Sequence, residues 1–157
     1  MLLEIGSGNL SSHSPVLGEK IIHVDIDPKA YHLEAACDAH HLPFKDNTFE
    51  VVYCSHVLEH CLNPHQILKE IHRVTKRCAI LKVPNKFAKE DSEHIYSWTE
   101  HTLNNLASKV FKRTMTKNTY LIRPTQGKIK NILRYYIGFA EMLLTRKNEI
   151  TLTAFKN

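Results

Sequence analysis

The stretch LLEIGSGNLSSH, residues 2–13, carries the clearest indication of the fold of this chain. A short apolar run is followed at once by Gly6, Ser7 and Gly8. Glycine weakens the interior of a strand or helix by about 0.5–1 kcal/mol, so two glycines one residue apart need a reason. That reason is either a tight structural turn or a ligand that lies against the backbone, and the rest of the sequence helps to choose between them.

The length and composition of the chain indicate one globular domain. Its 157 residues can bury a core, and 43% hydrophobic with 24% charged residues is an ordinary soluble composition. No apolar run approaches the ~20 residues that cross a bilayer, and Glu4 is reached without a basic leader segment. Four cysteines without Cys-x-x-Cys spacing predict reduced thiols, so we expect a cytoplasmic location.

The positive charge of the chain is concentrated in its second half. The net charge is +5, and residues 109–130 hold seven Lys or Arg and no Asp or Glu. Such a segment attracts anionic partners, but a solvated basic face is the commoner explanation. Because no nucleic-acid-binding motif accompanies the charge, we do not predict a nucleic-acid partner.

Strand-like and helix-like segments alternate along the chain. Apolar runs and alternating patterns predict strands at residues 1–5, 20–26, 34–37, 49–55, 78–84, 111–117 and 149–155. A helix is predicted over 63–74, with Asn63 as its N-cap and Pro64 at its first position. A second is predicted over 97–110, where Ser97 and Glu100 form a Ser-x-x-Glu capping box.

This alternation predicts an α/β protein with a Rossmann-like, open and mostly parallel sheet of about seven strands. The early strands are continuous apolar runs, which is typical of strands that are covered on both faces, so we expect helices on both faces of the sheet. The two late alternating strands predict an antiparallel hairpin at the C-terminal edge. We expect one domain over residues 1–157, with a helical insertion at about 120–147 before the last strand.

The strongest helical pattern of the chain lies inside that insertion, over residues 128–147. Its broad apolar face is most simply explained by packing on the sheet. Three other uses stay open, namely a substrate lid, a homodimer surface, and peripheral contact with lipid headgroups through flanking Lys and Arg.

Acidic and small polar residues follow four predicted strands, where open α/β sheets bind their ligands. The dinucleotide pattern Gly-x-Gly-x-x-Gly is broken by Ser11, and there is no phosphate-loop Gly-Lys-Ser/Thr. Asp25, after the second strand, could accept hydrogen bonds from both hydroxyls of a ribose. Asp38, after the third strand, could accept one from an adenine amino group. These residues predict a site for a nucleoside without phosphates, whereas Asp27, which precedes Pro28, is predicted to be a helix cap.

With these motifs in order, the sequence resembles the class I S-adenosylmethionine-dependent methyltransferases, and within them the small-molecule methyltransferase subgroup. The resemblance covers about residues 2–110 and rests on five ordered segments: LLEIGSG, VDIDP, CDAHHLPFKDNTFEVVYCSHVLEH, ILKEIHRV and AILKVPN. It implies methyl transfer from S-adenosylmethionine to a small-molecule acceptor, of lipophilic or sugar type among the options. The third glycine of the family is Leu10 here, and the N-terminal helices that often cover the substrate are missing. These departures motivate an alternative, a catalytically degenerate module that binds the cofactor or a protein partner.

The resemblance also implies roles for individual residues. The implied cofactor-binding residues are Glu4, Gly6, Ser7 and Gly8 at the methionine part, Asp25 at the ribose, Ile26, Asp38 and Ala39 at the adenine, and Ser55 at the methionine end.

Two histidines follow the fourth strand, where the acceptor is expected. An unperturbed histidine titrates near pH 6.5, so His56 and His60 are the predicted catalytic bases if the acceptor must lose a proton. With Glu59 and His94 they also form a group of metal-ligand type. Because scattered histidines are a weak indication of a metal, we predict no metal ion and keep His56, Glu59, His60 and His94 as the candidates for one.

Overall fold

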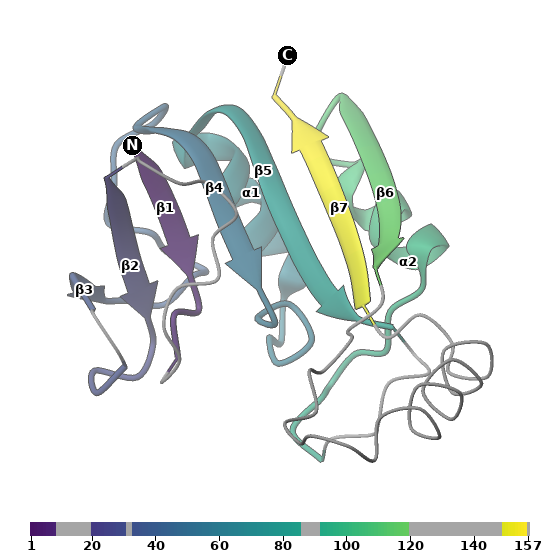
Figure 1. Ribbon diagram of the computed structural model, residues 1–157, viewed down its shortest axis with the longest axis horizontal. Coiled ribbons are helices and arrows are strands. Elements are labelled where there is room, and N and C mark those ends of the chain that lie inside the picture. Colours follow the sequence, from purple (N-terminus) through teal and green to yellow (C-terminus); the bar gives the residue numbers. More distant parts are fainter. Residues whose placement is uncertain (9–19, 31–32, 86–91, 120–148, 157) are drawn as a thin grey trace, which may run out of the picture.

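The computed structural model describes residues 1–8, 20–30, 33–85, 92–119 and 149–156, which form one mixed sheet (Figure 1). Its strand order is β3-β2-β1-β4-β5-β7-β6. The strands are β1 (Leu2–Ile5), β2 (Ile21–Asp25), β3 (Ala35–Ala36), β4 (Phe49–Ser55), β5 (Thr75–Pro84), β6 (Arg113–Thr119) and β7 (Glu149–Phe155). The first five are parallel, and β7 lies antiparallel between β5 and β6. The predicted Rossmann-like sheet with an antiparallel C-terminal hairpin is confirmed.

The centre of the sheet is apolar on both faces. All four residues of β1 are buried, which explains why the sequence there is a continuous apolar run broken only by Glu4. In β7 the buried residues Ile150, Leu152 and Ala154 alternate with half-buried ones, as the sequence pattern predicts. The outer strand β6 exposes 62% of Met115. Burial therefore falls from the middle of the sheet toward its edge.

The first helix, α1 (Pro64–Val74), is built as predicted. The Asn63 side chain accepts a hydrogen bond from the Gln66 backbone N–H at 3.2 Å, and Pro64 opens the helix without a donor to satisfy. The buried residues Ile67, Leu68, Ile71 and Val74 form the face that packs on the sheet. The apolar spacing thus explains both the helix and its orientation.

The second helix, α2 (Glu100–Ala107), begins three residues later than predicted. The N-cap is Thr99, not Ser97, and a reciprocal capping box joins Thr99 and Thr102. The reason is Trp98, which is only 4% exposed and forms a parallel β-bridge with Asn85. Pairing with the end of β5 keeps the chain extended through Trp98, so the helix cannot begin at Ser97.

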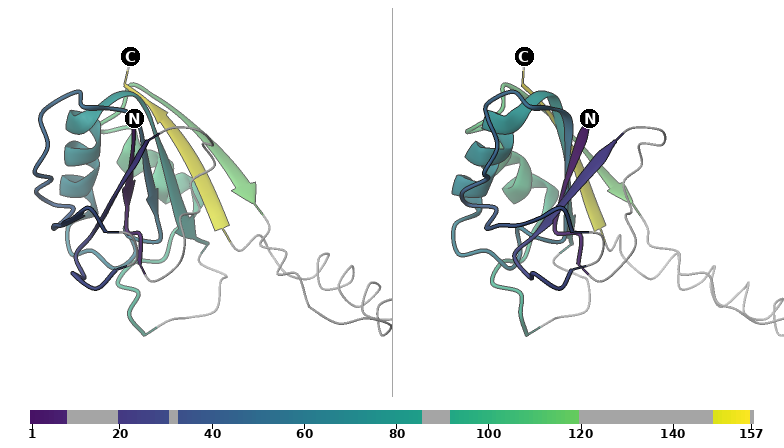
Figure 2. Two further views of the ribbon diagram at one scale, coloured as in Figure 1. Left: turned by 60° about the vertical axis from the view of Figure 1, so that its left-hand side comes forward. Right: turned by 90° about the vertical axis from the view of Figure 1, so that its left-hand side faces the viewer.

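The helices α1 and α2 lie on the same face of the sheet (Figure 2). The predicted helical cover is therefore seen on one face only among the residues that the structure describes. The predicted insertion at 120–147, its helix over 128–147, Leu10 and Ser11 lie outside them, and the single-domain boundary stays a prediction. Within the described chain, neither helix is long and apolar enough to span a membrane.

Candidate cofactor and acceptor site

The strands β1, β2, β4 and β5 all end at the same edge of the sheet (Figure 1). There the first turn is held to the neighbouring strand, because the N–H groups of Gly6 and Ser7 donate to the Val24 carbonyl at 2.9 and 3.4 Å. The Cys37 N–H donates to the Asp25 carbonyl at 2.8 Å, which places Asp38 beside the end of β2. The predicted nucleoside site is thus assembled from three adjacent strand ends.

The two glycines of the first turn are needed for different reasons. Gly6 has φ +80°, and a Cβ on it would collide with the Val57 side chain that follows β4. Gly8 has φ +55°, but a Cβ on it would meet nothing within 4 Å among the described atoms. Gly6 therefore serves close packing, whereas no atom of the described residues crowds the Cβ position of Gly8.

The carboxylate of Asp25 bridges the turns that follow β1 and β2. Its Oδ2 accepts from the Gly8 N–H at 2.8 Å, and its Oδ1 accepts from the Asp27 N–H at 2.9 Å. A carboxylate offers about four lone-pair positions, so each oxygen keeps capacity for one ribose hydroxyl. Asp27 caps a short turn and not a helix, since it accepts from the Lys29 N–H at 2.9 Å.

The residues predicted to meet the adenine lie around the end of β2 and the turn after β3. Ile26 is 74% exposed, which is unusual for a large apolar side chain and suits a flat base. The side chain of Asp38 accepts from the backbone N–H of His40 at 2.8 Å and lies 2.6 Å from His40 Nδ1. The hydrogen bond from the His40 backbone, and then that from its ring, lower the pKa of Asp38, so its second oxygen is an ionised acceptor.

The remaining cofactor-binding candidates differ in their surroundings. Ser7 is buried, and its hydroxyl has no hydrogen-bond partner among the described atoms, so it is available to bind a ligand. Ser55 ends β4 and is half-buried, and Ala39 is buried beside Asp38. Glu4 is buried instead with its carboxylate 2.9 Å from His23 Nδ1, so its immediate partner is a side chain of β2. Whether these residues bind the cofactor stays a prediction.

His56, the first predicted base, is clamped between two glutamates. Its backbone is in the left-handed region with φ +55°, and its Nε2 lies 2.8 Å from Glu149 Oε1. Its Nδ1 lies 3.1 Å from Glu59 Oε1, and Lys82 Nζ lies 3.1 Å from the other oxygen of Glu149. Hydrogen bonds to Glu149 and then to Glu59 raise the pKa of His56 to about 9.

Glu149 and Lys82 belong to this network and were not predicted from the sequence. Both residues lie on the paired strands β5 and β7. Glu149 opens β7 opposite Pro84, and Lys82 lies near the end of β5. The hydrogen bond from His56 is the main reason why the pKa of Glu149 is lowered. Since Glu149 and His56 are 93 positions apart, no local pattern could have joined them.

The structure brings together three of the four metal candidates. One ligand atom each from Glu59, His60 and His94 lies within 4.8 Å of the others, and the two imidazole centroids are 4.9 Å apart. His56 reaches this group only through Glu59. The second predicted base, His60, is exposed, and its Nδ1 lies 3.2 Å from the Glu93 carbonyl oxygen.

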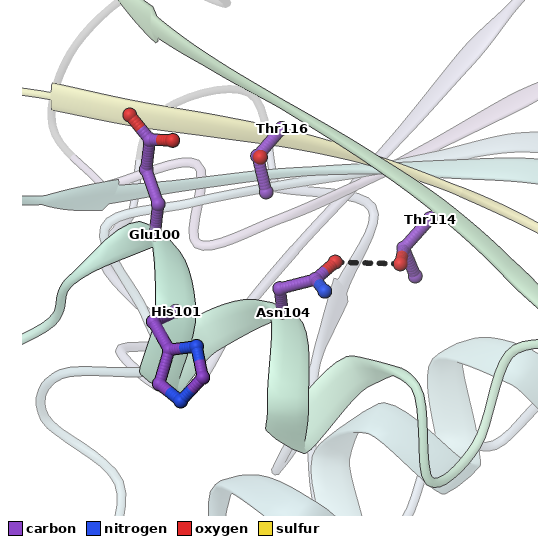
Figure 3. A pocket seen from close by; sticks show the side chains of 5 residues that line it. All are labelled: Glu100, His101, Asn104, Thr114 and Thr116. Atoms are coloured by element: carbon purple, nitrogen blue, oxygen red, sulfur yellow. Dashed lines mark hydrogen bonds between the residues drawn. The ribbon is translucent and has the colours of Figure 1, made fainter.

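A separate pocket of about 380 Å³ lies between α2 and the edge strand β6, as Figure 3 shows. Its lining is polar, and Thr114 closes one side by donating to Asn104 Oδ1 at 2.6 Å. It contains none of the predicted site residues. The lining residues are Glu100, His101, Asn104, Thr114 and Thr116.

A mostly parallel sheet with its turns and acids at the β1, β2 and β3 ends defines the class I methyltransferase fold. The family described as "Methyltransferase domain" matches residues 3–82, just over half of the chain. The chain belongs to this family and carries an S-adenosylmethionine-dependent methyltransferase domain.

The curated relatives that the chain matches are uncharacterized proteins. The uncharacterized protein YafS of Escherichia coli K12 is 34% identical over 74 residues, which are 46% of this chain and 30% of that protein. The chain spans less than a third of the curated relatives that it matches.

Two solved structures have the same fold. One is the methyltransferase bound to the Trm112 methyltransferase activator of Haloferax volcanii, with TM-score 0.70, 12% identity, and coverage of 99% of this chain and 81% of that one. A SAM-dependent methyltransferase from Archaeoglobus fulgidus has TM-score 0.64 and 17% identity, over 99% of this chain and 85% of that one. Both show the likeness in fold alone.

Proposed function

We propose that this chain binds S-adenosylmethionine at the ends of β1, β2 and β3 and transfers its methyl group to a small-molecule acceptor beyond β4. The observation that carries the proposal is the bridge from Asp25 to the Gly8 backbone, since it leaves hydrogen-bonding capacity on the carboxylate beside the glycine turn. Exposed Ile26 and the ionised carboxylate of Asp38 lie on the side where the base of a nucleoside would follow its ribose.

The cofactor, when bound, supplies an electrophilic methyl group, and the protein positions the cofactor and the acceptor relative to each other. Asp25 orients the ribose, the Gly6–Gly8 turn admits the methionine part, and Ser55 lines the approach from β4. Holding two reactants in line at near-attack distance accounts for a large share of such a rate enhancement.

The two predicted bases receive different roles in this proposal. Both ring nitrogens of His56 face carboxylate oxygens, which only accept, so His56 makes both hydrogen bonds as a donor and holds Glu59 and Glu149 in place. His60 is exposed and is the better candidate to take a proton from the acceptor. A His60→Gln variant should then lower kcat while leaving the affinity for the cofactor within about two-fold of wild type.

The direct test is titration calorimetry of the folded full chain with S-adenosylmethionine and S-adenosylhomocysteine. We expect saturable one-to-one binding of both. Protein with a native melting curve that gives no binding signal with either compound would contradict the proposal.

The alternative function is a degenerate methyltransferase-like module that binds cofactor or a protein partner without turnover. The sequence departure at Leu10, where the family has its third glycine, favours it. A panel of small hydroxyl and amine acceptors with radiolabelled cofactor separates the two functions. A monomer that methylates a panel member would reject the alternative, and tight cofactor binding without any turnover would favour it.

A further inference from the structure

The turn after β4 and the segment before α2 form a cluster of which the proposed methyl transfer uses only His60. We propose that Glu59, His60 and His94 bind a divalent transition-metal cation, of which Zn²⁺ is the best match. One ligand atom from each residue already lies within 4.8 Å of the others.

The backbone holds these two segments together. The Glu59 carbonyl accepts from the N–H groups of Ile95 and Tyr96 at 2.8 and 3.2 Å. The Tyr96 hydroxyl donates to the Leu62 carbonyl at 3.2 Å on the other side of the turn. His94 is therefore fixed beside His60 by contacts that span more than thirty positions in the chain, and no movement of the sheet is needed to bring the cluster together.

One carboxylate oxygen of Glu59 is unsatisfied among the residues that the structure describes. Glu59 has no exposed surface, and its Oε1 is occupied by His56 Nδ1 at 3.1 Å. Its Oε2 is buried and has no hydrogen-bond partner among the described atoms. A buried carboxylate oxygen without a partner is unfavourable, and a cation among the three side chains would satisfy it.

The second ring nitrogen of His60 is arranged as in many metal-binding histidines. Its Nδ1 lies 3.2 Å from the Glu93 carbonyl oxygen, which only accepts. The hydrogen bond therefore places the proton on Nδ1 and leaves a lone pair on Nε2. The contact of His56 with Glu59 would serve in the same way to orient the carboxylate ligand.

The ligand set selects the kind of cation. Two imidazoles and one carboxylate suit Zn²⁺ and its neighbours, whereas Mg²⁺ and Ca²⁺ prefer oxygen ligands alone. Ligands about 2.0–2.2 Å from one ion stand roughly 3.5 Å apart, a spacing that small shifts of His60 and His94 from within 4.8 Å can reach. Exposed His60 and half-buried His94 have room to do so.

Three protein ligands leave a tetrahedral ion one open position. If the proposed acceptor site beyond β4 is correct, the acceptor oxygen would bind at that position. The metal ion, and not His60, would then activate the acceptor. This part rests on the proposed function, but metal binding itself does not, because it can be measured without cofactor or acceptor.

The test uses the untagged full chain after treatment with a chelator. Zn²⁺ is titrated by calorimetry, and Co²⁺ is added as a spectroscopic probe, with Mg²⁺ as the comparison ion. We expect one Zn²⁺ per chain, a tetrahedral Co²⁺ absorption band, and no Mg²⁺ binding at the same concentrations. His60→Ala and His94→Ala should each weaken Zn²⁺ binding by about 100-fold or more, since even outer-shell changes cost 10–100-fold.

His101→Ala is the matched control, because His101 is exposed on α2 and contacts Asn105. It should bind Zn²⁺ like wild type. Glu59→Gln should also weaken binding, but this residue is buried, so its melting curve is recorded first. The proposal is overturned if wild type binds no Zn²⁺, or if loss of His60 and of His94 changes the affinity no more than loss of His101.

Discussion

Asp25 Oδ2 accepts a hydrogen bond from the backbone N–H of Gly8 at 2.8 Å, so a side chain of β2 shapes the turn after β1. The same carboxylate organises its own turn through the Asp27 N–H. One residue thus sets the geometry of both turns before any ligand arrives. Preorganisation of this kind reduces the ordering that a ligand would otherwise have to impose.

Replacing Asp25 should reduce cofactor affinity far more than stability. A hydrogen bond to a charged group contributes about 1.5–3 kcal/mol, so loss of two should weaken binding roughly ten- to several-hundred-fold in Asp25→Ala. Asp27→Ala is the control, since among the described residues the Asp27 side chain accepts from the Lys29 N–H alone, in an exposed turn. This substitution should lower stability by ~1 kcal/mol. Calorimetric affinities and melting curves of both variants are compared. Equal affinities of the two variants for the cofactor would show that the ribose does not bind to Asp25.

Alanine should be tolerated differently at the two glycines. Gly6→Ala should lower the free energy of unfolding by about 2–4 kcal/mol, because its Cβ meets the Val57 side chain at positive φ. In Gly8→Ala the new Cβ meets no atom of the described residues, so the change should lower the free energy of unfolding by only about 1 kcal/mol, the cost of the positive φ. Denaturant unfolding measures both. Adding Val57→Ala to Gly6→Ala should recover part of the loss relative to the sum of the single changes, and strict additivity would argue against this contact.

The link between β7 and the turn after β4 should stabilise the fold. Glu149 is buried and accepts from His56 and Lys82, so Glu149→Gln leaves two cations facing a neutral amide. Because both cationic side chains are partly exposed, we expect a loss of about 1–3 kcal/mol. Glu50→Gln on β4, which removes an exposed ion pair with Lys76 of β5, should cost less than about 1 kcal/mol. Chemical unfolding measures the loss of stability in both variants. A larger loss in Glu50→Gln than in Glu149→Gln would show that the Glu149 contacts do not stabilise the fold.

Acid should weaken the packing of α1 through Glu70. Hydrogen bonds from Arg73 hold the pKa of Glu70 below its ordinary value of 4.5. The folded state therefore binds fewer protons than the unfolded state, and this contribution is full above pH 4.5 and is lost as pH falls through the lower folded value. Between about pH 6 and about pH 3, wild type should lose more unfolding free energy than Glu70→Gln. Parallel curves for the two proteins would contradict this role.

The cap of α2 can be tested in the same way. Thr99→Ala removes the side chain that accepts from the Thr102 N–H at 3.1 Å, and should lower stability by about 1 kcal/mol. Ser97→Ala lies before buried Trp98 and should change it by less than about 0.5 kcal/mol. Thermal melts would contradict the observed cap if Ser97→Ala were the more damaging change.

Local patterns in the sequence were enough to predict most of the fold. Asn63 and Pro64 predict the start of α1, and apolar runs predict the parallel strands. The alternation of apolar and polar residues predicts β6 and β7. These signals are short-range, because caps and apolar periodicity act within a few residues. The positions of the glycine turn and of Asp25 at the ends of β1 and β2 are predictable for the same reason, because each directly follows or ends its strand in the sequence. Their role in binding the cofactor stays a prediction.

Long-range contacts decided the rest, and only the tertiary structure shows them. The pairing of Trp98 with Asn85 keeps the chain extended and sets where α2 begins. Glu149 contacts His56 although the two residues are far apart in the sequence. The cluster of Glu59, His60 and His94 exists because Ile95 and Tyr96 bind the Glu59 carbonyl. A sequence determines which residues can accept, donate or ligate, but which of them meet depends on how strands and turns pack together, and that is settled by the whole fold at once.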